Sequence, residues 1–237
     1  MAPEPLTFGS SVPGYVCGPL GAPAVVLLSE WWGVNENVRS HATKLAALGP
    51  FRVLVPDLYK GKIGHDKEEA AHLMSNLDWG VALSEVGQAV AHLQSEAPVK
   101  VGVTGFCMGG AMSLLAAATI PAVAAACPFY GTPQPDRCDL SRLVKPVLAH
   151  FGELDGHSGF SDPATAARLA SDLKAGGNPD SEVVLVPAQG HGFMNASPDP
   201  YKTFEERQAA MGMPPYDPAP VEAAWGRVTA FFRKHLA

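Results

Sequence analysis

The sequence contains no long hydrophobic run and no cluster of basic residues. No uninterrupted apolar stretch reaches the roughly 20 residues that a membrane-spanning helix needs. The opening residues, MAPEPLTFGS, lack a basic region followed by an apolar one, so we expect no secretory signal peptide and a cytoplasmic protein. The 17 Lys and Arg residues are outnumbered by 23 Asp and Glu residues, and the resulting net charge of −6 argues against a nucleic-acid partner.

Cysteine is also scarce, since the chain has only four. Their spacings match no zinc-binding pattern and include no C-x-x-C pair, so we expect no metal site built on them. Cys127 lies inside the apolar run AVAAACPFY, which is typical of a cysteine that packs as a small hydrophobic residue. Cys107 differs from it, because glycines stand on both sides of it in VGVTGFCMGGAMSLLAAA, residues 101–118.

Short apolar runs that alternate with helical patterns indicate an α/β fold. Strands are expected at residues 24–29, 52–56, 99–104, 123–130, 147–151 and 183–186, and helices at 35–48, 68–94 (with a break near 78–80), 107–118, 162–175 and 221–235. Strands that are apolar on both faces predict a mainly parallel central sheet with helices on both faces. The residues before 24 predict one or two short strands at an antiparallel edge.

The chain shows no linker between two hydrophobic cores and no internal repeat. We therefore expect one domain over residues 1–237. The proline-rich stretch 196–220 is expected to be irregular, as a lid or as a long surface connection.

The GxCxG sequence at residues 105–109 lies where a strand is expected to turn into a helix, and it has the form of a nucleophile elbow. The glycines remove side chains that would collide in so sharp a turn. The helix amino terminus favours a thiolate at Cys107, and the backbone amide of Met108 can face a developing oxyanion. The alternative is a glycine-rich turn with an incidental cysteine.

Two residues follow the elbow in the order in which such a site places its acid and its base. Asp155, in GELDGHSG, comes just after the strand expected at 147–151, and His191, in QGHGFMN, comes just after the strand expected at 183–186. Open α/β sheets build their sites at the carboxyl ends of their strands. We therefore expect His191 to transfer the proton and Asp155 to orient its ring.

Three neighbouring side chains are weaker candidates for these roles. Glu153 could replace Asp155 as the acid, but Asp155 lies deeper in the loop, where its side chain can turn toward the histidine. His157 is so close to Asp155 in the sequence that it would share the same loop, and it is interpreted as a surface residue. His150 lies within an expected strand and is interpreted as a core residue.

The stretch LLSEWWGVNEN, residues 27–37, leaves an early strand with a carboxylate at its end. Glu30 follows a buried strand directly and precedes two tryptophans, which is unusual for a surface carboxylate or a helix cap. The loop after such a strand supplies the second oxyanion donor in sites of this kind, and the amide of Trp31 is in position for it.

Five segments of the chain resemble the dienelactone hydrolase (carboxymethylenebutenolidase) family of α/β-hydrolases: SEWWGVN (29–35), PDLY (56–59), GFCMGGA (105–111), GELD (152–155) and GHGF (190–193). The resemblance implies an α/β-hydrolase fold, with Cys107 as nucleophile, His191 as base and Asp155 as orienter. It also implies that Glu30 manages the thiol proton, so that the thiol rests near this carboxylate and shifts toward the histidine as a thiolate when substrate binds.

The sequence departs from this family in the residues that hold the substrate. Members that hydrolyse dienelactones hold the substrate carboxylate with arginines. One of these lies four residues after the catalytic histidine, where this chain has Asn195, and another follows the PDLY segment, where this chain has no arginine between Arg52 and Arg137. The carboxylate clamp is therefore expected to be absent, and the candidate pocket residues are Trp31, Trp32, Tyr130, Phe193 and Asn195.

Together these residues predict an enzyme that cleaves a small carboxylic ester or lactone through an acyl-cysteine intermediate, without a metal or an organic cofactor. Activated esters and enol lactones are the expected substrates, because an amine is a harder leaving group. The protein is expected to be a monomer or a small homo-oligomer with no membrane partner. Two other classes remain open: a non-enzymatic protein that keeps the fold and binds a ligand or partner, and a thiol redox protein in which Cys127 resolves Cys107.

Overall fold

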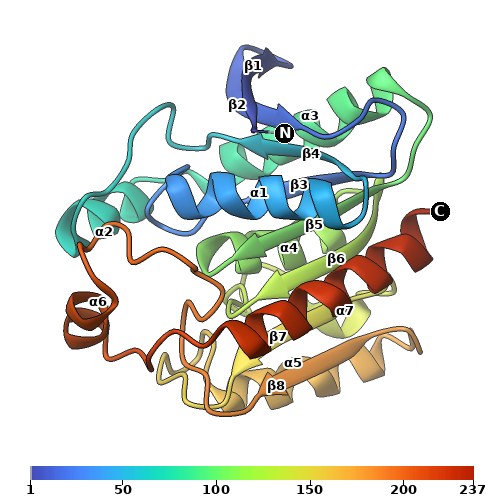
Figure 1. Ribbon diagram of the computed structural model, residues 1–237. Coiled ribbons are helices and arrows are strands. Elements are labelled where there is room, and N and C mark those ends of the chain that lie inside the picture. Colours follow the sequence, from blue (N-terminus) through green and yellow to red (C-terminus); the bar gives the residue numbers. More distant parts are fainter. Residues whose placement is uncertain (1) are drawn as a thin grey trace.

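An eight-stranded sheet forms the centre of the computed structural model, which describes residues 2–237. Its strands are β1 (Glu4–Phe8), β2 (Val12–Cys17), β3 (Ala24–Leu28), β4 (Arg52–Pro56), β5 (Val101–Phe106), β6 (Val123–Phe129), β7 (Leu148–Gly152) and β8 (Glu182–Val186). They lie side by side in the order β1-β2-β4-β3-β5-β6-β7-β8 (Figure 1).

The sheet is parallel from β4 to β8 and antiparallel only at the edge formed by β1 and β2. Every residue of β3 and of β5 is buried, as expected for parallel strands that are covered on both faces. The predicted mainly parallel sheet and its antiparallel edge are therefore confirmed.

Helices cover both faces of this sheet (Figure 1). They are α1 (Glu36–Leu48), α2 (Lys67–Ser75), α3 (Trp79–Glu96), α4 (Met108–Thr119), α5 (Pro163–Ala175), α6 (Phe204–Met211) and α7 (Pro218–Leu236), with a short 3₁₀ helix at Leu140–Arg142. One core cluster packs α3, α4 and α5 against the sheet, and the other packs α1 and α7. Among the helices of residues 2–237, none combines the length and the apolar character needed to cross a membrane.

The break that was expected near residues 78–80 lies between α2 and α3. Asp78 begins the second of these helices, because its Oδ1 accepts hydrogen bonds from the amides of Gly80 and Val81 at 2.8 and 3.0 Å. A single amphipathic pattern in the sequence thus becomes two helices, separated at a capping aspartate.

Residues 196–220 differ from the prediction, because they contain α6 and the start of α7, which begins three residues before the expected position. Thr203 caps α6 by accepting a hydrogen bond from the amide of Glu206 at 3.2 Å, and Gly212 ends the helix in the left-handed conformation with φ 65°. Lys67 of α2 donates a hydrogen bond to the carbonyl of Ala210, and α2 and α6 lie together at one end of the sheet (Figure 1).

Candidate active site

Cys107 lies at a sharp turn between β5 and α4, where its backbone adopts φ 54° and ψ −115°. A positive φ is uncommon for a residue other than glycine and persists only where the surrounding structure enforces it. The amide of Cys107 donates to the carbonyl of Phe129 at 3.0 Å. A Cβ on Gly105 would lie 2.3 Å from the carbonyl oxygen of Gly109, and one on Gly109 would lie 2.5 Å from that of Leu28. Close backbone approach therefore requires both glycines.

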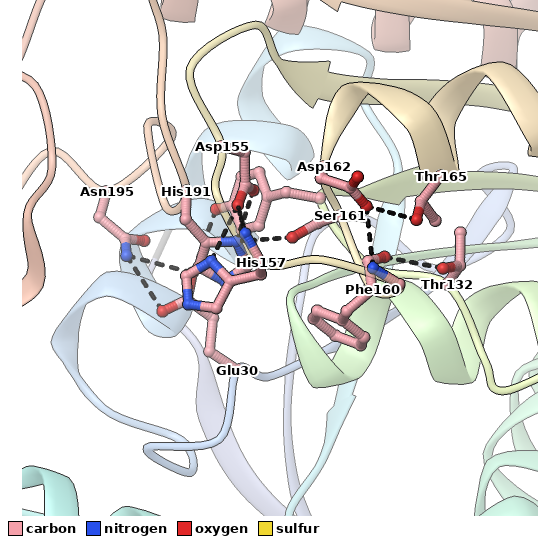
Figure 2. A network of polar contacts seen from close by, with 12 residues as sticks. Glu30, Thr132, Asp155, His157, Phe160, Ser161, Asp162, Thr165, His191 and Asn195 are labelled. Atoms are coloured by element: carbon pink, nitrogen blue, oxygen red, sulfur yellow. Dashed lines mark hydrogen bonds and ion pairs between the residues drawn. The ribbon is translucent and has the colours of Figure 1, made fainter.

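Asp155 and His191 come from the loops that follow β7 and β8, and their side chains point toward each other (Figure 2). Nδ1 of His191 lies 2.8 Å from Oδ2 of Asp155, and the Asp155 side chain is fully buried. The Tyr130 ring packs against the imidazole with 5.0 Å between ring centroids. Because Nδ1 is bound to the carboxylate, Nε2 is the nitrogen that remains for proton transfer.

The charges around His191 favour its protonated form. Burial opposes the charge, but the negative charges of Cys107 and Asp155 outweigh it and raise the pKa of His191 to about 10. Burial likewise opposes the ionised form of Asp155, but hydrogen bonds from His157 and His191 hold the pKa of this carboxyl well below its usual range. The surroundings thus favour a positively charged histidine beside an ionised carboxylate.

His157 contacts the same carboxylate as His191. Its backbone amide donates to Oδ1 of Asp155 at 3.1 Å, and its ring Nδ1 lies 2.8 Å from this oxygen (Figure 2). The His157 side chain is 51% exposed, so it lies at the surface as interpreted, but its contact with the acid was not anticipated. The Asp-x-His spacing offered a signal, because aspartate side chains commonly bind the amide two residues further on.

The same three side chains are the candidates for a metal site. Asp155, His157 and His191 each offer one ligand atom, and these atoms lie within 4.8 Å of one another. Two imidazoles and a carboxylate are ligands that zinc accepts. Hydrogen bonds already join these three groups, however, and account for their arrangement without an ion.

Glu30 is 6% exposed and is held by neutral donors. The Tyr130 hydroxyl donates to its Oε1 at 3.1 Å, and Nδ2 of Asn195 lies 3.1 and 3.0 Å from its two carboxylate oxygens. The amide of Asn195 also contacts His41, whose Nε2 lies 3.3 Å from Asn195 Oδ1. Within residues 2–237 no hydrogen bond joins Glu30 to Cys107, so in this structure the carboxylate is turned toward Asn195 and Tyr130.

A cavity lies between the elbow and the 196–220 segment. The sequence-predicted residues that line it are Glu30, Trp31, Trp32, Cys107, His191 and Asn195. Tyr201, Arg207 and Met213 line it from the other side. Two of the pocket candidates lie in the core behind it, because Tyr130 is 0% and Phe193 5% exposed. Their rings pack against each other at 5.5 Å, and Tyr130 reaches the site through its hydroxyl group.

The two predicted oxyanion donors flank the elbow. Met108 is the first residue of α4, so its amide has no acceptor within the helix. Trp31 lies in the loop after β3, and the close approach of Gly109 to the Leu28 carbonyl brings this loop against the start of α4. Trp31 lines the same cavity as Cys107, and Met108 follows Cys107 directly in the chain.

Arg207 brings a positive charge that the sequence did not place at the site. It is 5% exposed, and one terminal nitrogen donates to the carbonyls of Asn195 and Ser197 at 3.2 and 3.3 Å. Its guanidinium carbon lies 5.0 Å from the centroid of the Phe204 ring. Burial lowers the pKa of Arg207, and the negative charge of Glu30 opposes this effect. The sequence has no arginine at the places where the family resemblance predicts a substrate-binding one. Arg207, which belongs to α6, lines the cavity instead.

The alternative residues are engaged elsewhere. Glu153 accepts a hydrogen bond from the amide of Ala188 at 3.0 Å, and His150 is fully buried in β7 with its ring stacked on Phe129.

The four cysteines are free thiols, and the buried Cys127 contacts the Leu148 carbonyl at 3.1 Å.

Comparison with known proteins identifies the family. Residues 12–236 match the model of the dienelactone hydrolase family. Protein usf of Aquifex pyrophilus is 29% identical, over 96% of this chain and 95% of that protein. A predicted carboxymethylenebutenolidase of Aquifex aeolicus (strain VF5) is 31% identical over the same shares of the two chains.

The fold is also that of solved structures with low sequence identity. The crystal structure of a predicted dienelactone hydrolase from Klebsiella pneumoniae subsp. pneumoniae superposes with a TM-score of 0.78, at 23% identity and over 98% of both chains. The expected α/β-hydrolase fold is therefore confirmed. Because the family match spans nearly the whole chain, the chain belongs to the dienelactone hydrolase family and is a carboxylic ester or lactone hydrolase.

Proposed function

We propose that this hydrolase cleaves its ester or lactone through an acyl-enzyme on Cys107, with His191 as general acid and base and Asp155 as its orienting residue. One observation carries the proposal. The thiol at the elbow and the histidine bound to Asp155 line the same cavity, on loops that meet at one end of the sheet.

In the first half of the reaction, Cys107 gives its thiol proton to His191, the sulfur attacks the carbonyl carbon of the substrate, and the carbonyl oxygen becomes an oxyanion. The amides of Trp31 and Met108 donate hydrogen bonds to this oxyanion. The tetrahedral intermediate then collapses, the carbon–oxygen bond to the alkoxide breaks, and His191 gives its proton to the leaving oxygen. The product of this half is a thioester on Cys107 and an alcohol group, which leaves when the substrate is an ester and stays attached to the acyl group when it is a lactone.

In the second half, a water molecule takes the place of the alcohol. Neutral His191 removes a proton from this water, the hydroxide attacks the thioester, and the sulfur leaves as a thiolate. Asp155 stabilises the imidazolium that forms in this step. His191 takes up and gives back each proton of the two half-reactions, so these steps need neither a metal nor an organic cofactor.

Glu30 acts in this scheme on the resting thiol. A carboxylate beside Cys107 would disfavour a permanent thiolate and so protect the sulfur from oxidation between turnovers. The hydrogen bonds from Tyr130 and Asn195 offer Glu30 a second position, away from the sulfur, during catalysis. Replacement of Glu30 by glutamine is therefore expected to change both the rate and the pH profile.

The cavity favours a small substrate that carries an acidic group. Trp31 and Trp32 offer apolar surface, and Arg207 offers a positive charge. Within residues 2–237 no hydrogen bond engages Nε or the second terminal nitrogen of Arg207, which leaves these donors for a ligand.

The proposal is tested by turnover of a small activated aryl ester with matched cysteine variants. Cys107→Ala should abolish turnover, whereas Cys138→Ala, which removes another partly exposed free thiol, should leave it intact. Equal activity of wild type and Cys107→Ala would favour a non-enzymatic role for the elbow. A reversible loss of two thiols in mild peroxide, without loss of esterase activity, would favour the redox alternative with Cys127.

A further inference from the structure

The Asp155 carboxylate is shared by two histidines, and each contacts a different oxygen (Figure 2). His191 binds Oδ2 at 2.8 Å. His157 binds Oδ1 twice, through its backbone amide at 3.1 Å and its ring Nδ1 at 2.8 Å. The carboxylate therefore cannot rotate without breaking a hydrogen bond on each side.

We propose that His157 is a positioning residue of the catalytic site: its Nδ1–H group holds Asp155 so that Oδ2 faces His191. The inference rests on the proposed roles of Asp155 and His191, and it adds a third residue through which the acid is oriented. Side chains that support a reacting group through hydrogen bonds are needed to keep it in the productive geometry.

The chemistry of the contact fixes which nitrogen of His157 carries a proton. An ionised carboxylate oxygen can only accept hydrogen bonds, so the Nδ1 atom at 2.8 Å must be the donor. The His157 ring also packs beside the His191 ring, with 4.3 Å between their centroids. Two separate contributions can thus be distinguished, namely the hydrogen bond to Asp155 and the ring that covers the catalytic imidazole.

The loop around His157 does not depend on this side chain for its shape. The backbone carbonyl of His157 accepts hydrogen bonds from the amides of Phe160, Ser161 and Asp162 at 3.1, 3.0 and 3.2 Å. Its backbone amide binds Asp155 whatever the side chain is. Substitution of the half-exposed ring should therefore leave the fold intact and change only what the imidazole does.

Two variants separate the hydrogen bond from the ring. His157→Asn keeps a side-chain donor near the position of Nδ1 but removes the ring, and His157→Phe keeps the ring but removes the donor. With the aryl ester, we expect kcat of His157→Asn to stay within about threefold of wild type. We expect kcat of His157→Phe to fall about tenfold, because a hydrogen bond to a charged group is lost, while KM changes little in both variants.

His65→Phe is the matched control, because it places the same ring at another exposed histidine, far from the site in sequence. It should have wild-type kcat. Full activity of His157→Phe, or an equal loss of kcat in the Asn and Phe variants, would overturn the proposal. The proposal would also be overturned if the melting temperature of His157→Phe fell and His157→Asn lost kcat.

A spectroscopic measurement keeps this test separate from the acyl-cysteine mechanism. In the Cys107→Ala protein, the downfield proton resonance of His191 Nδ1–H reports the hydrogen bond to Asp155. Adding His157→Asn should preserve this resonance, and adding His157→Phe should shift or broaden it. An unchanged resonance in the Phe variant would contradict the positioning role, even if Cys107 proves not to be the nucleophile.

Discussion

His191 lies between two negative groups, and this arrangement links the reaction rate to pH. Its pKa is raised to about 10 by the charges of Cys107 and Asp155, which outweigh the effect of burial. A base with a raised pKa keeps its proton to higher pH. In the free enzyme His191 is therefore expected to stay protonated up to about pH 10, and kcat/KM, which depends on the free enzyme, is expected to fall above it.

Asp155→Asn should move this alkaline limit to lower pH. The variant removes one of the charges that hold the proton on His191, so the pKa of the histidine falls, and an amide also favours the wrong tautomer. We expect kcat/KM for an aryl ester to fall by about 10²- to 10⁴-fold, with the alkaline limb displaced downward. The rate is measured between about pH 6 and pH 11, with exposed Asp136→Asn as control. An alkaline limb at the wild-type position would contradict the role of Asp155.

Among single residues, the sequence predicts those that belong to spaced motifs. It misses residues that reach the site only because tertiary packing brings them there. Cys107 is marked by two glycines, and its positive φ and the close backbone contacts explain why they are needed. His157 is interpreted from the sequence as a surface residue because it shares the loop of Asp155; its side chain is indeed half-exposed, but this exposure does not prevent its bond to Asp155. Tyr130 and Phe193 were predicted to line the pocket, but both are buried. An aromatic residue near a site can thus belong to the core behind it.

Among the elements, α6 brings Arg207 to the cavity, although it is the helix that the sequence did not reveal. Its sequence FEERQAAM is short and polar, and Arg207 is its one buried residue. Neither its length nor its periodicity separates such a segment from an irregular loop. The apolar strands and the amphipathic helices, by contrast, were predicted close to their observed bounds, because apolar residues recur at regular spacing along each of them.

Arg207→Gln should weaken the binding of acidic substrates specifically. The variant removes the positive charge from the cavity and leaves Glu30 without its cationic neighbour. For an aryl ester with a carboxylate substituent, we expect KM to rise about tenfold or more, while KM for the matched neutral ester changes little. Exposed Arg168→Gln serves as the control. Equal changes of KM for the two esters would mean that Arg207 supports α6 rather than the substrate.

At the scale of the whole molecule, two buried histidines, His150 and His41, make the stability of the fold depend on pH. His150 is fully buried, and within residues 2–237 neither ring nitrogen has a hydrogen-bond partner. Burial lowers the pKa of His150 from 6.5 to about 3. Between these values the unfolded chain binds a proton that the folded protein does not, so the free energy of unfolding falls as the pH decreases below 6.5.

His150→Leu should remove the contribution of His150 to this dependence and leave the fold at least as stable at pH 7, since an unpaired buried polar group is replaced by an apolar one. Between pH 7 and pH 5 the wild type should lose about 2 kcal/mol more unfolding free energy than the variant. Urea unfolding at the two pH values measures this difference. His41, whose pKa is lowered to about 4, remains in both proteins and gives both a residual pH dependence. Parallel losses in the two proteins would show that His150 is not the group responsible.

The most direct test of the proposed mechanism is mass spectrometry of the protein quenched during turnover of an activated aryl acetate. If Cys107 is the nucleophile, the intact protein should carry one acetyl group, and peptide mapping should place it on Cys107 rather than on Cys17, Cys127 or Cys138. The adduct should be absent from Cys107→Ala, which should also be inactive. Turnover by Cys107→Ala, or an acetyl group on another residue in the active wild type, would contradict an acyl-enzyme on Cys107.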